Sequence, residues 1–118
     1  IAAVYNGKPC LDVGLMTDVF SGYGKSDGII RAVRCMSPDY IVTDELGADA
    51  KSIRQAVNSG SGLIMTAHAD SIEEAYRNEG IRTVIDSGAI QHIALVQSHR
   101  ITAVKQLITA EANAVCTI

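Results

Sequence analysis

The clearest structural pattern of the chain lies in "YIVTDELGADAKSIRQAVNSGSGLIMTAH", residues 40–68. Its two ends, "YIVTD" (40–44) and "GLIMTAH" (62–68), are short continuous apolar runs, which are typical of strands buried on both faces. Between them, Ile53, Ala56 and Val57 recur at helical spacing, and Gly60 is placed to stop a helix. A strand, a crossover of this length and a second strand predict a βαβ unit, whose strands run parallel.

A second amphipathic helix is expected upstream of this unit. Ile29, Ile30, Val33 and Met36 fall on one helical face, and Pro38 ends the helix. Met36 on that face, and Met65 in the second strand, are read as core residues.

Downstream, Ser71 and Glu74 have the spacing of a capping box at the start of a helix. A short helix over 81–86 stops near Gly88. The runs "IQHIALVQ" and "ITAVKQLIT" then flank the connection "SHR", which predicts a β-hairpin. We therefore expect one α/β domain with a mostly parallel sheet flanked by helices and a C-terminal β-hairpin.

The composition narrows the function classes. The chain has 118 residues, of which 47% are hydrophobic and 19% charged, as in ordinary globular domains. A formal net charge of -3 and the scarcity of aromatic residues argue against a nucleic-acid partner. Cys10, Cys35 and Cys116 form no CxxC pair, so we expect free thiols. No apolar run reaches the roughly 18 residues of a membrane span.

The segment "VFSGYGKSDGII" (19–30) contains the last three letters of a P-loop, Gly24-Lys25-Ser26. The full pattern GxxxxGK[ST] requires a glycine five positions before Gly24, where this chain has Val19. A β-branched residue resists the positive φ that a phosphate cradle uses. We therefore interpret the segment as a glycine-rich turn that caps a helix.

The residues most suited to chemistry follow the first strand. Asp44 and Glu45 would lie at the carboxyl edge of a parallel sheet, where α/β proteins bind ligands. Asp44 can hold Mg²⁺, which prefers oxygen ligands, and Glu45 can polarise a water for attack on a γ-phosphate. An apolar strand followed by Asp-Glu is the Walker B pattern. The alternative is a solvated strand end, with Gly47 starting a turn.

The neighbouring strand also ends in polar residues. Thr66 and His68 would emerge at the same edge as Glu45, where a hydroxyl can contact a γ-phosphate and an imidazole can hydrogen-bond a phosphate or the attacking water. A lone strand-end His is more often structural, but two adjacent strands ending in useful side chains favour a site. Asp70 stands at a helix start, where capping explains it without a metal.

"MSPDYIVTDELG" followed by "GLIMTAHADSIEEAYR" resembles the ATPase family of stage III sporulation protein AA. That family is related to the RecA-like motors of type II and type IV secretion and of pilus retraction. The likeness extends to "IAAVYNGKP" and "DVGLMTDVFSGYGKSDGIIRAVRCMSPD". It implies a RecA-like P-loop NTPase core whose P-loop lies upstream of Ile1. The chain starts without Met, in what reads as a strand under way, so we expect residues 1–118 to be the C-terminal part of one ATPase domain.

The resemblance also implies roles for individual residues. Asp44 and Glu45 would form the Walker B motif, with Asp44 as the metal ligand and Glu45 as the catalytic residue. Thr66 and His68 would lie in a His-box strand, with His68 catalytic and Thr66 contacting nucleotide. Asp18, after Thr17, would belong to an acidic motif that faces the nucleotide, and Arg34 matches a family arginine that is structural or reaches a phosphate.

By family analogy, the whole protein would bind ATP and Mg²⁺ and assemble into a ring, as a hexamer. Arg31 and Arg34 share an exposed helical face; they are either a solvated basic pair or the source of an arginine finger for a neighbouring subunit. The ring would sit in the cytoplasm, on the inner face of a membrane channel of the sporulation complex, with no nucleic-acid partner. The isolated chain is expected to hydrolyse ATP poorly or not at all.

Two other function classes remain open from the residues. A metal-dependent hydrolase would use Asp44, Glu45, His68 and Asp70 around a bound cation. A binding or scaffold module would keep the fold but perform no chemistry.

Overall fold

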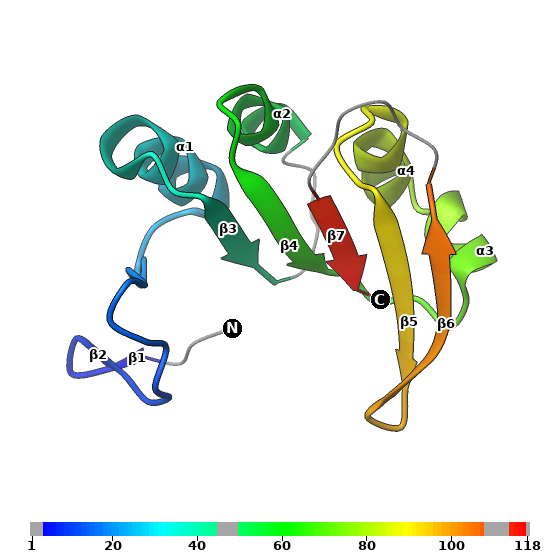
Figure 1. Ribbon diagram of the computed structural model, residues 1–118, viewed down its shortest axis with the longest axis horizontal. Helices are drawn as coiled ribbons and strands as arrows, with labels where there is room; N and C mark the ends of the chain where they lie inside the picture. Colours follow the sequence, from blue (N-terminus) through cyan, green and yellow to red (C-terminus); the bar gives the residue numbers. More distant parts are fainter. Residues whose placement is uncertain (1–3, 45–49, 108–113, 118) are drawn as a thin grey trace.

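A five-stranded sheet forms the centre of the molecule in the computed structural model, which describes residues 4–44, 50–107 and 114–117. The strand order is β3-β4-β7-β5-β6 (Figure 1). The bounds are β3 (Tyr40–Thr43), β4 (Gly62–Thr66), β5 (His92–Gln97), β6 (Arg100–Gln106) and β7 (Ala114–Thr117). The pairs β3–β4, β4–β7 and β5–β7 are parallel, and only β5–β6 is antiparallel among these described strands.

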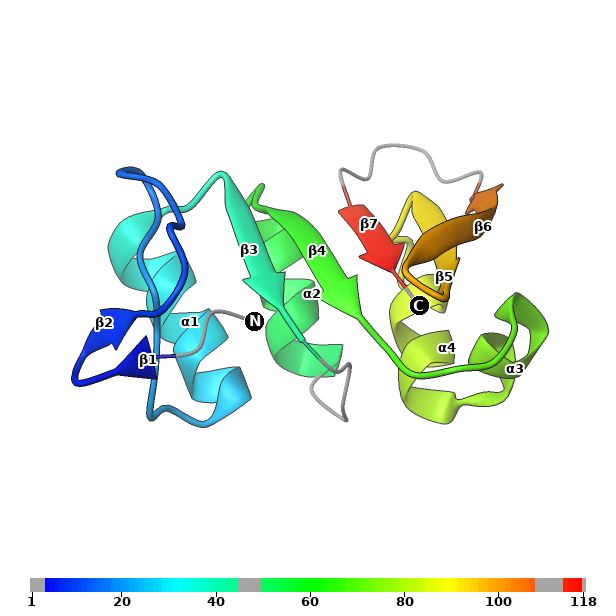
Figure 2. The ribbon, with the colours of Figure 1, turned by 90° about the horizontal axis from the view of Figure 1, so that it is seen from below.

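Helices cover one face of this sheet. The described helices are α1 (Lys25–Met36), α2 (Ala50–Asn58), α3 (Ile72–Arg77) and α4 (Glu79–Asp86). Seen from below in Figure 2, the strands lie in front, and α1, α2 and α4 lie behind them. The core fills the space between these two layers, with Ile53, Leu63, Met65, Ile81 and Ile93 almost completely buried.

The predicted βαβ unit is confirmed. Strands β3 and β4 are parallel, with Tyr40 opposite Gly62 and Thr43 opposite Met65, and α2 forms the crossover. The helix ends where expected, because Gly60 adopts a φ of 89°, a conformation that glycine tolerates without strain. The Gly62 amide then donates to the Asp39 carbonyl over 2.7 Å, which aligns the starts of the two strands.

The expectation that these strands are buried on both faces is wrong for the described residues. Ile41, Leu63 and Met65 face the helices and are buried, whereas Val42 is 53% exposed and Ile64 38% exposed on the opposite face. Side chains alternate along a strand, so a continuous apolar run fills both faces whether or not each is covered. No described helix covers the second face.

Helix α3 begins with the predicted cap. The Ser71 hydroxyl accepts from the Glu74 amide over 3.1 Å. The Glu74 carboxylate reaches one residue beyond the usual capping box and accepts from the Asp70 amide over 2.8 Å. The expectation that Asp70 caps this helix is therefore wrong, because Ser71 holds that position.

Two predicted core assignments have opposite outcomes. Met65 is fully buried under the helices, as expected, but Met36 at the end of α1 is exposed. In α1 the buried contact is made by Ile29, with Val33 packed against the core. The helix ends at Ser37 in a left-handed conformation, directly before Pro38.

The antiparallel pair β5–β6 lies at the "SHR" connection, where Ser98 and His99 adopt positive φ. The hairpin formed by β5 and β6 is not the last element of the chain, contrary to expectation. Strand β7 follows it in sequence and inserts between β4 and β5. At the other end of the chain, β1 (Val4–Tyr5) and β2 (Lys8–Pro9) form a separate small antiparallel sheet. Within the described residues, no helix combines the length and the apolar character that crossing a bilayer requires.

Candidate functional site

The carboxyl edge of the sheet brings together two of the predicted site residues. Asp44 directly follows β3, and Thr66 is the last residue of β4. Because Thr43 pairs with Met65 in the parallel register, Asp44 and Thr66 are the next residues along neighbouring strands. The ends of parallel strands are where α/β sheets place ligand-binding groups.

Lys25 forms an ion pair with Asp44. Its ammonium lies 3.3 Å from the Asp44 Oδ1 atom and also donates to the Asp44 backbone carbonyl. The hydrogen bond from Lys25, together with its positive charge, lowers the pKa of the Asp44 carboxyl. The Asp44 side chain is 58% exposed and that of Lys25 33% exposed, so water still reaches the pair.

The sequence predicted a helix-capping turn at Gly24-Lys25-Ser26, and Gly24 is indeed the N-cap of α1. It did not predict that Lys25 would meet Asp44. The short connection between α1 and β3 indicates this contact, because a helix joined to the next strand by a short turn runs antiparallel to that strand. The first residue of α1 must then lie near the last residue of β3.

A cavity of about 610 Å³ opens beside this ion pair. It lies between the N-terminal segment, α1 and β3, and Lys25 and Asp44 both contribute to its wall. Thr17 also lines it, as do the aromatic rings of Phe20 and Tyr23, whose centroids are 5.8 Å apart. The remaining wall is largely apolar, formed by Val13, Val19, Ile29, Ile41 and Val42.

Asp18 and His68 are exposed and belong to segments without regular structure. Asp18 follows the cavity-lining Thr17, whereas His68 lies two residues beyond Thr66, where the chain leaves β4 toward α3. Glu45 lies outside the described residues, so its predicted role stays a prediction.

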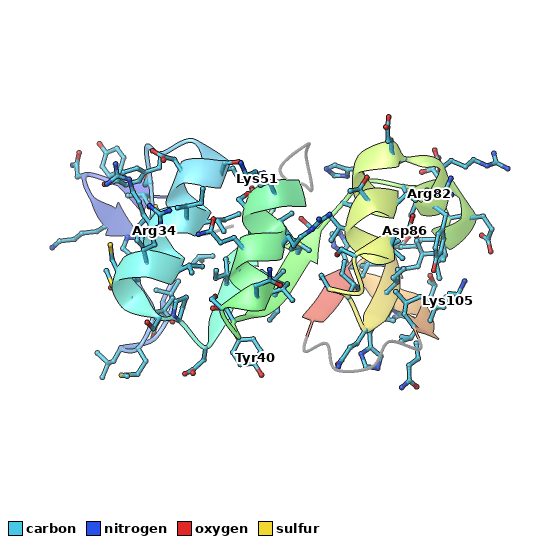
Figure 3. All side chains as sticks on the ribbon, turned by 90° about the horizontal axis from the view of Figure 1, so that it is seen from above. Arg34, Tyr40, Lys51, Arg82, Asp86 and Lys105 are labelled. Atoms are coloured by element: carbon cyan, nitrogen blue, oxygen red, sulfur yellow. The ribbon has the colours of Figure 1, made fainter. Side chains whose placement is uncertain are left out.

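Arg34 is not brought to this edge. It is exposed in the last turn of α1, nine residues after Lys25, which corresponds to roughly 13 Å along the helix axis. Figure 3 shows Lys51, near the start of α2, and Tyr40, at the start of β3, at opposite sides of the molecule. Arg31 is held elsewhere, with Nε 3.7 Å from Asp27 and its guanidinium over the Tyr23 ring.

The described donors fit a Mg²⁺ ion shared with phosphate. Mg²⁺ usually keeps several waters and takes one or two protein carboxylates plus substrate phosphates. Asp44 provides one exposed carboxylate, and Thr66 provides a hydroxyl on the adjacent strand. Nowhere in residues 4–44, 50–107 and 114–117 do three His, Cys, Asp or Glu side chains gather as a metal cage. The metal-dependent hydrolase reading therefore gains no support from these residues.

Comparisons with known proteins point to one family. Residues 1–112 match the family described as sporulation stage III, protein AA. Stage III sporulation protein AA of Bacillus subtilis (strain 168) is 28% identical over 91 residues, which cover 75% of this chain and 30% of that relative. The matched region thus spans less than a third of the relative's length. No solved structure gives a significant match.

Proposed function

Because this chain belongs to the family of sporulation stage III, protein AA, we propose that it is part of an ATP-hydrolysing motor that acts in sporulation. The matched region covers 30% of the curated relative, so this activity is proposed for the whole protein. The P-loop that binds the phosphates would lie upstream, in a RecA-like core to which this chain contributes β3, α2 and β4.

The observation that carries the proposal is the position of Asp44 beside Thr66, at the shared carboxyl edge of two parallel strands. Asp44 would hold Mg²⁺, directly or through a water. The bound ion would neutralise charge on the ATP phosphates. Thr66 would donate a hydrogen bond to the γ-phosphate.

Glu45 would orient and polarise the attacking water, as the residue after the metal ligand does in the Walker B pattern. His68, exposed beyond the end of β4, would hydrogen-bond a phosphate or that water. Asp18 would act from the N-terminal segment that borders the cavity through Thr17.

The assembly proposed for the whole protein is a hexameric ring on the cytoplasmic side of a membrane channel of the sporulation complex. The location of Arg34 in the last turn of α1, away from Asp44, supports a role toward a neighbouring subunit or a purely structural one. Both the ring and the channel rest on the family relationship.

The test is ATP hydrolysis by the full-length protein with Mg²⁺, compared with its Glu45→Gln variant. We expect turnover to fall by about 100-fold or more in the variant, because the water loses its orienting base, while ATP binding survives. Glu73→Gln, which changes an exposed glutamate on α3, is the matched control and should hydrolyse normally. Equal turnover in Glu45→Gln and the control would remove Glu45 from the mechanism.

Absence of turnover in the full-length protein under conditions where it assembles would favour the scaffold reading. In that case, nucleotide could still bind, and the variants would not differ.

A further inference from the structure

Lys25 holds an unusual place relative to Asp44. It is the first residue of α1, 19 positions before Asp44 in sequence, yet it contacts both the carboxylate and the backbone carbonyl of that residue. Two acceptors on one residue fix the ammonium more closely than a single surface ion pair does. The contact therefore places a positive charge where the proposed function requires a metal ion.

The local structure explains how Lys25 reaches this position. The α1 N-cap is Gly24, whose lack of a side chain leaves the first turn uncapped by a side-chain hydrogen bond. Helix α1 starts at the carboxyl edge of the sheet and ends near the beginning of β3, so its first side chain points toward the residue that follows β3. Figure 2 shows this antiparallel course of α1 and β3.

We propose that Lys25 is a positioning residue that occupies the cation site beside Asp44 and is displaced when a divalent cation binds there. This inference rests on the proposed function, in which Asp44 holds Mg²⁺. An ammonium and a divalent cation repel each other, so the two cannot contact one carboxylate oxygen together at low cost. A metal ion that binds directly at Oδ1, the oxygen that pairs with Lys25, would therefore move Lys25.

The structure offers room for that movement. Lys25 and Asp44 line the same cavity of about 610 Å³, and the lysine side chain has four flexible methylene groups. The released ammonium remains tethered to α1 at the same edge of the sheet. There it can contact the phosphates that arrive with the metal, since Lys binds phosphate as a point charge. The Lys25 ammonium would thus exchange its contact with the Asp44 carboxylate for a contact with the nucleotide phosphates.

The test measures Mn²⁺ binding to the full-length protein without nucleotide, by electron paramagnetic resonance titration. Lys25→Met should tighten Mn²⁺ binding about threefold to fivefold, the range expected for release of a partly exposed ion pair. Lys51→Met is the matched control, because it removes the same charge from the exposed start of α2. It should change the affinity less than about twofold, through general electrostatics alone.

Asp44→Asn separates failure of this inference from failure of the proposed function. If it leaves Mn²⁺ affinity unchanged, the metal does not bind at Asp44, and both proposals are wrong. If it weakens Mn²⁺ binding while Lys25→Met behaves like Lys51→Met, or weakens binding, only the displacement of Lys25 is refuted.

A second readout follows Lys25 itself. In full-length protein with ¹³C-methylated lysines, titration with Mg²⁺ should move the Lys25 signal and leave the Lys51 signal nearly unchanged. The Lys25 movement should disappear in Asp44→Asn. A Lys25 signal that ignores saturating Mg²⁺ in the wild-type protein would contradict the displacement.

Discussion

Replacing Met65 by alanine tests the two-layer architecture that positions the site. Met65 lies in β4, is fully buried and faces the helices. A buried Met→Ala change costs about 2–5 kcal/mol, through lost transfer free energy and the remaining cavity. We expect about 3 kcal/mol here. For 118 residues, the unfolding entropy converts this loss into a fall in Tm of about 12 °C.

Ile64 is the matched control, because it neighbours Met65 on the same strand but is 38% exposed on the face without a described helix. Ile64→Ala should cost only about 1 kcal/mol, since part of its side chain already contacts water. The assay is thermal and urea unfolding of the 118-residue chain followed by circular dichroism. Equal losses for the two variants would refute one-sided burial of β4.

Three further outcomes follow from local contacts. The depressed pKa of Asp44 contributes stability that is complete above its ordinary value of 3.8 and is lost as pH falls through the lower folded value. Lys25→Met should reduce this dependence of stability on acid pH, by less than about 1 kcal/mol, in urea titrations at pH 2–6. Ser71→Ala should destabilise the chain by about 1 kcal/mol in urea unfolding, whereas Ser71→Asp, which can still cap α3, should be nearly neutral. Gly60→Ala should lower stability by about 1 kcal/mol, because φ is 89° there although nothing lies within 4 Å of the added Cβ; a neutral thermal melt would refute this backbone strain.

The elements that local rules govern could be predicted from the sequence. The spacing of Ile53, Ala56 and Val57 gave a helix, and the intervening length required parallel strands, as β3 and β4 confirm. The Ser71 cap was readable because it depends on residues three apart. Asp44 and Thr66 could be placed at one edge because parallel strands fix which ends coincide.

Side-chain burial and long-range side-chain contacts depend on tertiary packing, and they could not be predicted from the local sequence. An apolar run indicates that Val42 and Ile64 can be buried. It does not indicate whether a second layer of structure covers their face of the sheet. Met36 satisfied the helical period of α1, yet it extends past the core at the end of the helix. The local pattern around Lys25 indicates only a partial P-loop motif, whereas its partner in the structure, Asp44, is 19 residues away.

Strand β7 illustrates a long-range choice. The sequence suggested that the chain ends in a hairpin, but β7 pairs in parallel with β4 and β5 and separates them. It lies beyond residue 112, where the family match ends. A four-residue strand has too little periodicity to be recognised, and its position depends on strands distant in sequence.

Mg²⁺-dependent ATP binding by full-length Asp44→Asn shows whether Asp44 is the metal ligand. Asp39→Asn is the matched control, because Asp39 stands at the opposite end of β3 and is also exposed. We expect Mg²⁺ to strengthen ATP binding in the wild-type protein and in Asp39→Asn, and this enhancement to fall at least about tenfold in Asp44→Asn. Equal Mg²⁺ enhancement in all three proteins would contradict the assignment of Asp44 as the metal ligand.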